Sequence, residues 1–217
     1  MKTKVKICGL TDERGVAAAI DGGADYIGLN FFRRSPRFVS IETAAELVTA
    51  LPRKVIPVGL FVDPTPAELA KILEHVRLGM IQLHGKETPK HIDDIRKAYG
   101  LPVMKAVGVS SLRDLKAALA YEDHADWLLF DAKPPKSATR PGGNAVSFDW
   151  DLMKSYEGSL PWMLAGGLTS RNVAKAIKQS GARAVDVYSG VETKPGVKSP
   201  AKIRSFLKAA KGAKAGK

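Results

Sequence analysis

Two residues suited to acid–base chemistry stand at the ends of short apolar runs. Cys8 ends the run 5–8, and Asp131 follows the run 127–130. A thiol can act as a general base if its pKa falls, and a carboxyl group can act as a general acid if its pKa rises. However, a lone cysteine is more often an inert buried residue, and an aspartate after an apolar run can simply cap a helix. Position alone therefore leaves both catalytic roles open.

Two glycine turns follow later apolar runs and could hold an anion. Gly166-Gly167 follows the run 162–165, and Ser189-Gly190 follows the run 184–187. Free backbone N–H groups at the start of a helix favour an anion, and glycine lets the backbone approach it closely. The alternative is that these glycines only make tight turns. Their presence in two successive loops favours a phosphate site.

Three more side chains could contact a ligand. Arg37 follows Arg33 and Arg34 in a loop, and its planar guanidinium could bind a carboxylate through two hydrogen bonds, although a solvated basic loop is the alternative. Gln82 and His84 stand at the end of the run 80–83. His84 could transfer protons, but a hydrogen-bonded residue that lines the site is the simpler interpretation.

The elements that must position these residues form eight repeated units. Apolar runs occur at 5–8, 26–30, 56–61, 80–83, 103–106, 127–130, 162–165 and 184–187. Helix signals lie between them, such as the capping box of Thr65-Pro66-Ala67-Glu68 followed by an apolar stripe. The runs are mostly unbroken, as expected for parallel strands that are buried on both faces. The repeats predict alternating strands and helices, either in a closed barrel or in a doubly wound sheet.

Polar residues within the runs favour the barrel. Lys6, Cys8, Gln82, His84 and Asp186 occupy places where barrel strands point inward. Strands one and eight are neighbours in a closed barrel, so we expect Lys6 and Asp186 to pair inside it, because a buried charge needs a partner. We therefore predict an α/β fold, a single-domain (β/α)₈ TIM barrel over residues 1–210 with a basic tail over 211–217. Barrel active sites lie at the C-terminal ends of the strands, where all the candidate residues above would meet.

Composition and charge narrow the function further. The 217 residues carry a net charge of +12, and eight of these positive charges come from residues 194–217, which hold no acidic residue. A lysine-rich end is usually solvated, and binding of a polyanion is the alternative. The single cysteine favours a reducing compartment, the cytoplasm, and no apolar run is long enough for a membrane span. The sequence lacks metal-ligand, dinucleotide-binding and Walker motifs, which favours a reaction without a cofactor. The two glycine turns favour a small phosphorylated substrate.

A set of motifs in order along residues 4 to about 208 resembles the phosphoribosylanthranilate isomerase family. The motifs are Lys6-Ile7-Cys8-Gly9-Leu10-Thr11, Ser35-Pro36-Arg37, Gln82-Leu83-His84-Gly85, Phe130-Asp131, Phe148-Asp149-Trp150, Ala165-Gly166-Gly167-Leu168 and Asp186 with Ser189-Gly190-Val191-Glu192. The resemblance implies the third step of tryptophan synthesis from chorismate. In that step N-(5-phosphoribosyl)anthranilate becomes 1-(o-carboxyphenylamino)-1-deoxyribulose 5-phosphate by an Amadori rearrangement.

The resemblance also implies a role for each candidate residue. Asp131 would be the general acid that opens the furanose ring, and Cys8 would be the general base that removes the proton from C2′. Arg37 would hold the anthranilate carboxylate. The turns at Gly166-Gly167 and Ser189-Gly190 would hold the phosphate, and Gln82 and His84 would line the substrate site.

Two positions depart from the family pattern. Tyr188 stands where the family commonly has serine, and a phenol cannot fill the same space beside a phosphate. Either its side chain turns away and backbone amides bind the phosphate, or the affinity for phosphate is weaker. Ala145 replaces a glycine in the loop before Phe148, which should modestly restrict the loop without changing the type of reaction.

Other functions remain to be weighed. Another phosphosugar barrel, such as the related isomerase of histidine synthesis or a pentose-phosphate epimerase, would use different acid–base pairs or metal ligands. A non-catalytic nucleic-acid binder would rely on the basic C-terminus and would show steep salt dependence. The cysteine–aspartate pair favours the isomerase, with no nucleic-acid or membrane partner and either a monomer or a homodimer as the assembly.

Overall fold

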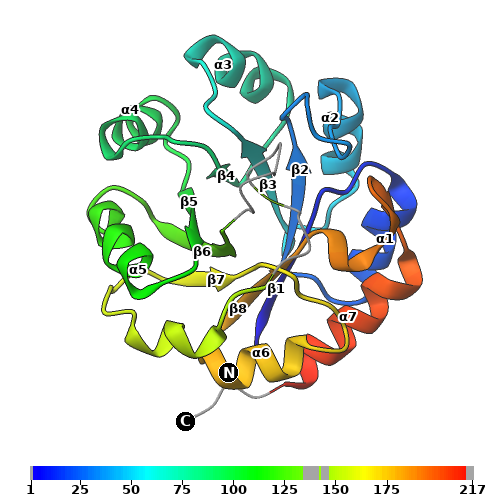
Figure 1. Ribbon diagram of the computed structural model, residues 1–217. Coiled ribbons are helices and arrows are strands. Elements are labelled where there is room, and N and C mark those ends of the chain that lie inside the picture. Colours follow the sequence, from blue (N-terminus) through cyan, green and yellow to red (C-terminus); the bar gives the residue numbers. More distant parts are fainter. Residues whose placement is uncertain (1, 134–141, 143–146, 214–217) are drawn as a thin grey trace.

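The computed structural model describes residues 2–133, 142 and 147–213, and strands alternate with helices along these residues (Figure 1). The strands of the main sheet are β1 (Lys4–Cys8), β2 (Tyr26–Asn30), β3 (Ile56–Phe61), β4 (Met80–Leu83), β5 (Val103–Val109), β6 (Trp127–Ala132), β7 (Trp162–Leu164) and β8 (Ala184–Val187). The predicted runs 26–30, 56–61, 80–83 and 184–187 coincide with β2, β3, β4 and β8. β5 and β6 run further than predicted, so that Asp131 lies within β6 instead of after it.

The strands close into a barrel, which settles the choice between the two predicted architectures. Every neighbouring pair is parallel, and β1 pairs with both β2 and β8. In the register of β1 with β8, Lys6 lies opposite Asp186. A doubly wound sheet would leave two edge strands, whereas Figure 1 shows a ring of strands surrounded by helices. The predicted (β/α)₈ barrel is therefore confirmed.

The helices follow the capping signals of the sequence, with one exception. They are α1 (Glu13–Asp21), α2 (Ile41–Thr49), α3 (Pro66–His75), α4 (Pro89–Tyr99), α5 (Leu112–Ala118), α6 (Val173–Ser180) and α7 (Pro200–Gly212). The capping box of α3 is formed by reciprocal hydrogen bonds between Thr65 and Glu68. Between β6 and β7 the described residues hold a 3₁₀ helix (Trp150–Ser155) and no α-helix, so this unit departs from the regular pattern.

Two shorter 3₁₀ helices and a hairpin complete the described chain. The 3₁₀ helices are Leu119–Tyr121 and Ser189–Val191, and the hairpin strands are β9 (Glu192–Lys194) and β10 (Val197–Lys198). β9 and β10 are antiparallel and join β8 to α7. They bring Glu192 and Lys198 near the end of β8, where both side chains are buried.

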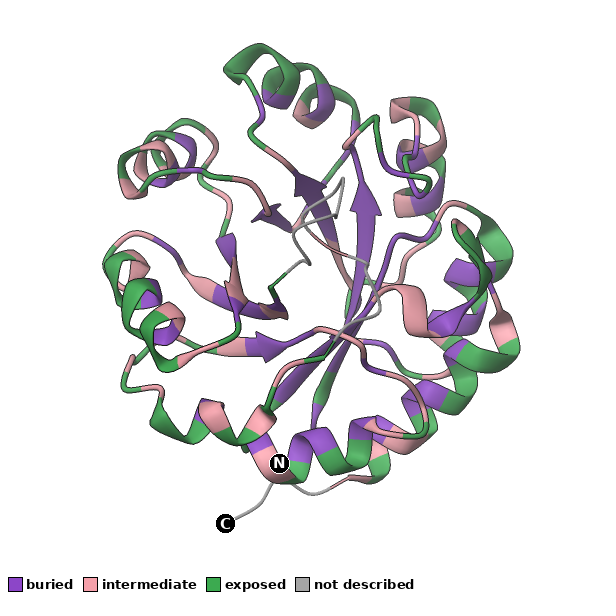
Figure 2. Cartoon of the chain, viewed as in Figure 1, coloured by how far each residue is buried: buried purple, intermediate pink, exposed green. Residues whose placement is uncertain are grey.

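The apolar core has two parts, because the strands are buried on both faces (Figure 2). One part lies between the barrel and the helices, where the stripe of α7 contributes Ile203, Phe206 and Leu207. The other fills the barrel interior with Val58, Met80, Met104, Leu129 and Met163. A filled interior leaves the loops at the ends of the strands as the place for a ligand.

A buried ion pair inside the barrel confirms the expected partner of Lys6. Lys6 is fully buried, and its Nζ lies 3.0 Å from Asp186 Oδ1 and 2.7 Å from Gln82 Oε1. A charge removed from water needs such partners, because desolvation costs several kcal/mol, on the order of the whole stability of a domain. The pair thus joins β1 to β8, and Gln82 extends the contact to β4.

A second buried pair fixes the loops after β3 and β4. Lys105 Nζ lies 2.7 Å from both Glu87 Oε2 and the carbonyl oxygen of Gly85. Glu87 Oε1 in turn accepts the backbone N–H groups of Asp63 and Gly85. These bonds tie β5 to the loops after β3 and β4, next to His84.

The C-terminal helix extends to Gly212 and therefore includes two residues that we had assigned to the basic tail. Lys211 pairs with Asp25, and residues 214–217 lie outside the described residues. Ala145 lies outside them as well. Among the described residues, no helix has the length and apolar character to cross a membrane.

The Lys105–Glu87 pair should be a major source of stability. We expect Lys105→Met to lower the free energy of unfolding by about 3–5 kcal/mol, because it leaves the buried Glu87 carboxylate without its cation. Urea denaturation measures this change. The matched control is Lys90→Met, which removes an exposed pair with Asp94 and should change stability by less than ~1 kcal/mol. Equal effects of the two variants would contradict the importance of the buried pair.

Candidate active site

One pocket at the C-terminal ends of the strands contains eight of the nine predicted site residues. They are Cys8, Gln82, His84, Asp131, Gly166, Gly167, Ser189 and Gly190. Asn30, Ser35, Asp186 and Tyr188 also line the pocket, together with the apolar side chains of Phe32, Leu60 and Val62. Arg37 is the predicted residue that does not line it. The barrel therefore brings together residues that are up to 182 positions apart.

Cys8 occupies the last position of β1 and is buried. Burial raises the pKa of its thiol, and the nearby Lys6 ammonium opposes this shift. The thiol is therefore the stable form of Cys8 at neutral pH. Lys6 still offers the thiolate a positive neighbour, which is what a cysteine base needs.

Asp131 lies near the end of β6 with only 13% of its side chain exposed. Burial, followed by the negative charge of Asp186, raises its pKa to about 7. The Ala132 N–H, which donates to Oδ1 at 2.8 Å, and the Lys6 ammonium oppose the shift. A carboxyl group with this pKa can hold a proton near neutral pH and give it up, which suits a general acid.

His84 is a neutral neighbour of Asp131. Its Nε2 lies 3.6 Å from Asp131 Oδ2, and burial, with the positive charges of Lys105 and Lys6, lowers its pKa to about 3. Gln82 Oε1 accepts from Lys6, so the amide nitrogen of Gln82 faces His84 Nδ1 at 3.5 Å. This arrangement places the imidazole proton on Nε2, on the side of Asp131. The histidine can thus donate to an oxygen in the pocket without carrying a charge.

The two predicted glycine turns meet at the side of the pocket formed by β7 and β8. Gly166 and Gly167 have φ values of +88° and +61°, which an L side chain rarely adopts. A Cβ at Gly190 would lie 1.9 Å from the carbonyl oxygen of Leu168, so this turn also requires glycine. The backbone N–H groups of Gly166 and Gly167 have no acceptor within the described part of the chain. Two close backbone turns with free donors form a cradle suited to a phosphate.

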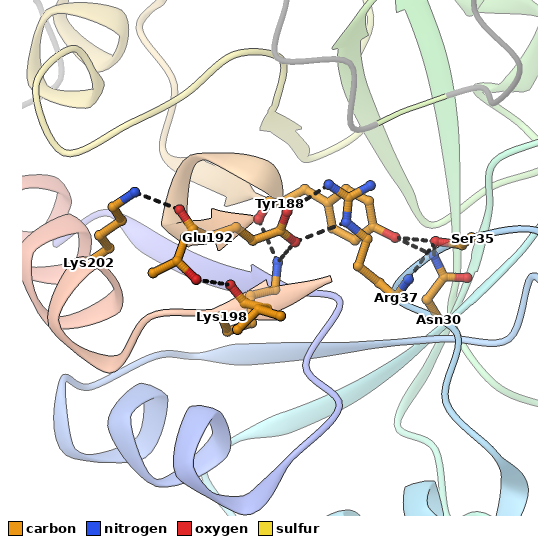
Figure 3. A network of polar contacts seen from close by, with 9 residues as sticks. Asn30, Ser35, Arg37, Tyr188, Glu192, Lys198 and Lys202 are labelled. Carbon is orange, nitrogen blue, oxygen red and sulfur yellow. Dashed lines mark hydrogen bonds and ion pairs between the residues drawn. The ribbon is translucent and has the colours of Figure 1, made fainter. Parts of the chain in front are cut away.

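Arg37 lies behind the wall of the pocket. It is buried, and its Nε and Nη2 donate to the two carboxylate oxygens of Glu192 at 2.9 and 2.7 Å. Its Nη1 has no hydrogen-bond partner among the described residues. The guanidinium lies 4.6 Å from the centre of the Tyr188 ring, which covers it (Figure 3).

Tyr188 runs from the end of β8 to the loop after β2. Its hydroxyl accepts from Asn30 Nδ2 and lies 3.3 Å from Ser35 Oγ. Figure 3 shows Asn30 and Ser35 at the phenol end, with Glu192 and Lys198 on the other side of Arg37. The Lys198 ammonium lies 4.9 Å from the ring centre and 2.9 Å from Glu192 Oε1.

Sequence reasoning left four members of this network without a role. Asn30 carried a usable signal, because it is a polar residue at the C-terminal end of an apolar run. Ser35 lies in the motif Ser35-Pro36-Arg37, in which only the arginine had a predicted role. Glu192 ends the motif Ser189-Gly190-Val191-Glu192, but nothing in that motif indicated a bond to Arg37. Lys198 gave no signal, because the burial of both residues depends on how the β9–β10 hairpin packs.

The fold and the pocket define the class of protein: a (β/α)₈-barrel enzyme whose pocket holds a buried thiol, a buried carboxyl group and two glycine turns. Within the described ranges, no group of His, Cys, Asp and Glu residues is arranged to hold a metal ion. The chain matches the family model described as N-(5′-phosphoribosyl)anthranilate (PRA) isomerase over residues 5–209. It belongs to that family, and it is an isomerase of tryptophan biosynthesis.

Individual relatives agree with this assignment. The chain is 58% identical to the N-(5′-phosphoribosyl)anthranilate isomerase of Paramagnetospirillum magneticum, over 98% of this chain and 99% of the relative. A solved isomerase from Thermotoga maritima, described as dimeric and studied as monomers, superposes with a TM-score of 0.84 at 37% identity, over 97% and 99% of the two chains. A solved isomerase in complex with reduced 1-(o-carboxyphenylamino)-1-deoxyribulose 5-phosphate gives 0.85 at 36% identity, with the same coverage.

The raised pKa of Asp131 makes a prediction about stability. The folded protein keeps this proton up to about pH 7, whereas the unfolded chain releases it near pH 4, so the wild type loses stability as the pH rises between these values. Asp131→Asn removes this penalty. We expect the variant to gain roughly 2 kcal/mol over the wild type between pH 5 and pH 8, measured by urea denaturation. A difference that does not change with pH would contradict the assigned pKa.

Proposed function

We propose that the chain catalyses the Amadori rearrangement of N-(5-phosphoribosyl)anthranilate to 1-(o-carboxyphenylamino)-1-deoxyribulose 5-phosphate, with Asp131 as general acid and Cys8 as general base. The observation that carries the proposal is that one pocket holds a carboxyl group that keeps its proton to about pH 7 and a thiol beside a buried ammonium. The relative solved with a reduced form of this product supports the choice of substrate.

In the first step Asp131 gives its proton to the ring oxygen of the ribose. The bond between C1′ and that oxygen breaks, and the nitrogen lone pair forms the C1′ iminium. Burial suits Asp131 to this step, because it favours the neutral acid before the transfer. Gln82 and His84 line the same part of the pocket, and the neutral imidazole can donate to a ribose oxygen from Nε2.

In the second step the Cys8 thiolate removes the proton from C2′. The electrons of the C2′–H bond form the C1′–C2′ double bond and neutralise the iminium, which gives the enolamine. The enolamine then tautomerises to the ketone. The proton that Cys8 gains balances the proton that Asp131 has lost, so the pair returns to its starting state by proton exchange. These steps use only groups of the chain and its substrate, so we propose that no cofactor takes part.

The two ends of the substrate are anions, and the pocket offers each a different environment. The turns at Gly166-Gly167 and Ser189-Gly190 would hold the phosphate through backbone N–H groups. The apolar side chains of Phe32, Leu60 and Val62 provide a wall for the aryl ring. Arg37 would serve the anthranilate carboxylate through its positive charge, which lies behind the Tyr188 ring.

The alternative of a nucleic-acid binder has less support. Among the basic residues of the C-terminal segment, Lys198 is buried against Glu192, Lys202 donates to the carbonyl oxygen of Glu192, and Lys211 pairs with Asp25. Lys198 is therefore removed from the surface, and Lys202 and Lys211 are bonded to groups of the molecule itself. A thiol base also requires a reduced cysteine, which supports the cytoplasm as the compartment. The dimeric Thermotoga maritima relative supports the homodimer among the two predicted assemblies.

Loss of the base should abolish most of the turnover. We expect Cys8→Ala to lower kcat by at least ~10², measured as the decay of anthranilate fluorescence on freshly generated phosphoribosylanthranilate. The control is Val5→Ala, on the same strand but packed in the outer core, which should cost stability and leave kcat nearly unchanged. Near-normal turnover by Cys8→Ala would remove Cys8 from the reaction.

The pH profile should reveal an unusual order of protonation. The reactive form needs Asp131 protonated and Cys8 ionised, yet burial raises the thiol pKa above that of Asp131. Between the two pKa values the pair holds one proton, and in most molecules this proton is on Cys8. The reactive form, with the proton on Asp131, is a small fraction that does not change with pH in this range. We expect kcat/KM to rise up to about pH 7 and then to level off until the thiol itself ionises. A decline that begins at pH 7 would show that the thiol has the lower pKa.

A further inference from the structure

The hydrogen bonds around the Tyr188 hydroxyl leave its proton without an acceptor among the described residues. Asn30 Oδ1 accepts the backbone N–H of Phe32 at 2.8 Å, so the amide group of Asn30 faces the other way and donates to both Ser35 Oγ and the Tyr188 hydroxyl. Ser35 Oγ also accepts the backbone N–H of Arg37 at 3.2 Å. Both lone pairs of Ser35 are therefore used.

This arrangement decides which hydroxyl donates to the other. Since Ser35 already accepts twice, it donates its own proton to Tyr188 across the 3.3 Å contact. The Tyr188 oxygen then accepts from Asn30 and from Ser35, and its own proton has no acceptor among the described residues. Both Ser35 and Tyr188 line the pocket, so the spare donor is available to a ligand.

The charges behind the ring favour an anionic acceptor. Arg37 and Lys198 lie within 5 Å of the ring centre, at 4.6 and 4.9 Å, and share the single carboxylate of Glu192. The buried group thus carries one net positive charge beneath the ring. Burial, followed by the influence of Cys8, raises the pKa of Tyr188 to about 12, so the phenol keeps its proton at neutral pH. A neutral donor backed by a net positive charge suits a carboxylate.

The position of the Tyr188 hydroxyl indicates which of the two substrate anions, the phosphate or the aryl carboxylate, it would contact. The phosphate cradle is formed by the turns after β7 and β8. The Tyr188 side chain leads away from it, past Gly9 at the end of β1, to Asn30 and Ser35 at the end of β2. Phe32, which lines the pocket, lies between these two residues in the sequence and provides part of the apolar wall for an aryl ring. The hydroxyl therefore lies at the aryl end of the proposed substrate.

We propose that Tyr188 is a specificity-determining residue whose hydroxyl donates a hydrogen bond to the aryl carboxylate of the substrate, in front of the buried Arg37. This inference rests on the proposed function, because it takes the substrate to be an anthranilate. It assigns the direct contact to the phenol and leaves Arg37 and Lys198 to act through their charge. It also explains how the chain accommodates a large side chain beside the phosphate cradle: the ring points away from it.

The test compares two ligands that differ only in the carboxylate. The first is reduced 1-(o-carboxyphenylamino)-1-deoxyribulose 5-phosphate, and the second is the same compound with an unsubstituted phenyl ring. Calorimetry measures the Kd of both for the wild type, for Tyr188→Phe and for the control Tyr99→Phe, which removes a phenol hydroxyl from the exposed bond to the Pro66 carbonyl. The second ligand also reports whether the pocket of each variant is intact.

We expect Tyr188→Phe to weaken binding of the carboxylated ligand about tenfold or more, as for loss of a hydrogen bond to a charged group, and to leave binding of the phenyl ligand unchanged. Tyr99→Phe should change neither. An equal loss for both ligands would overturn the proposal, because the hydroxyl would then serve the ribose or the packing of the pocket. Unchanged binding of both would overturn it too. If the wild type neither binds the carboxylated ligand nor isomerises phosphoribosylanthranilate, the proposed function fails as well, which distinguishes the two failures.

Discussion

The closure of the barrel at β1 is the constraint on which the rest of the site depends. Because β1 pairs with β8 as well as β2, Lys6 lies opposite Asp186 in register, and a charged pair forms where the apolar interior ends. The floor of the pocket is therefore ionic instead of apolar. Cys8 lies two residues further along β1 and must respond to these charges. Without closure, Lys6 would have no carboxylate partner and would not be buried at such a place.

The two members of this pair act in opposite directions on the ionisation of both Cys8 and Asp131. The Lys6 ammonium favours the ionised forms of both Cys8 and Asp131, whereas Asp186 opposes ionisation of both. Burial adds to the effect of Asp186, so the pKa of each group is raised and its neutral form is favoured. The buried Lys6–Asp186 pair thus influences the ionisation of both Cys8 and Asp131.

The sequence predicted the barrel well because its signals are local and repeated. Capping boxes, unbroken apolar runs and polar residues at strand ends all concern neighbours within a few positions, and the Lys6–Asp186 pair followed once the order of strands was known. The network around Tyr188 could not be predicted in the same way. It joins β2, β8 and the β9–β10 hairpin, so it depends on side-chain packing between segments more than 150 residues apart. Arg37 shows the difference: its motif was recognised, but its bidentate bond to Glu192 was not foreseen.

The packing around Tyr188 has a consequence for how this site can change during evolution. The ring covers an arginine whose Nη1 has no other partner among the described residues, and the phenol depends on an asparagine and a serine from another loop. A smaller side chain at position 188 would expose the guanidinium and remove an acceptor from Asn30. The effect of a substitution at any one of these positions must then depend on the residues at the others. Such coupling means that the consequence of a change at position 188 has to be judged together with Asn30, Ser35 and Arg37.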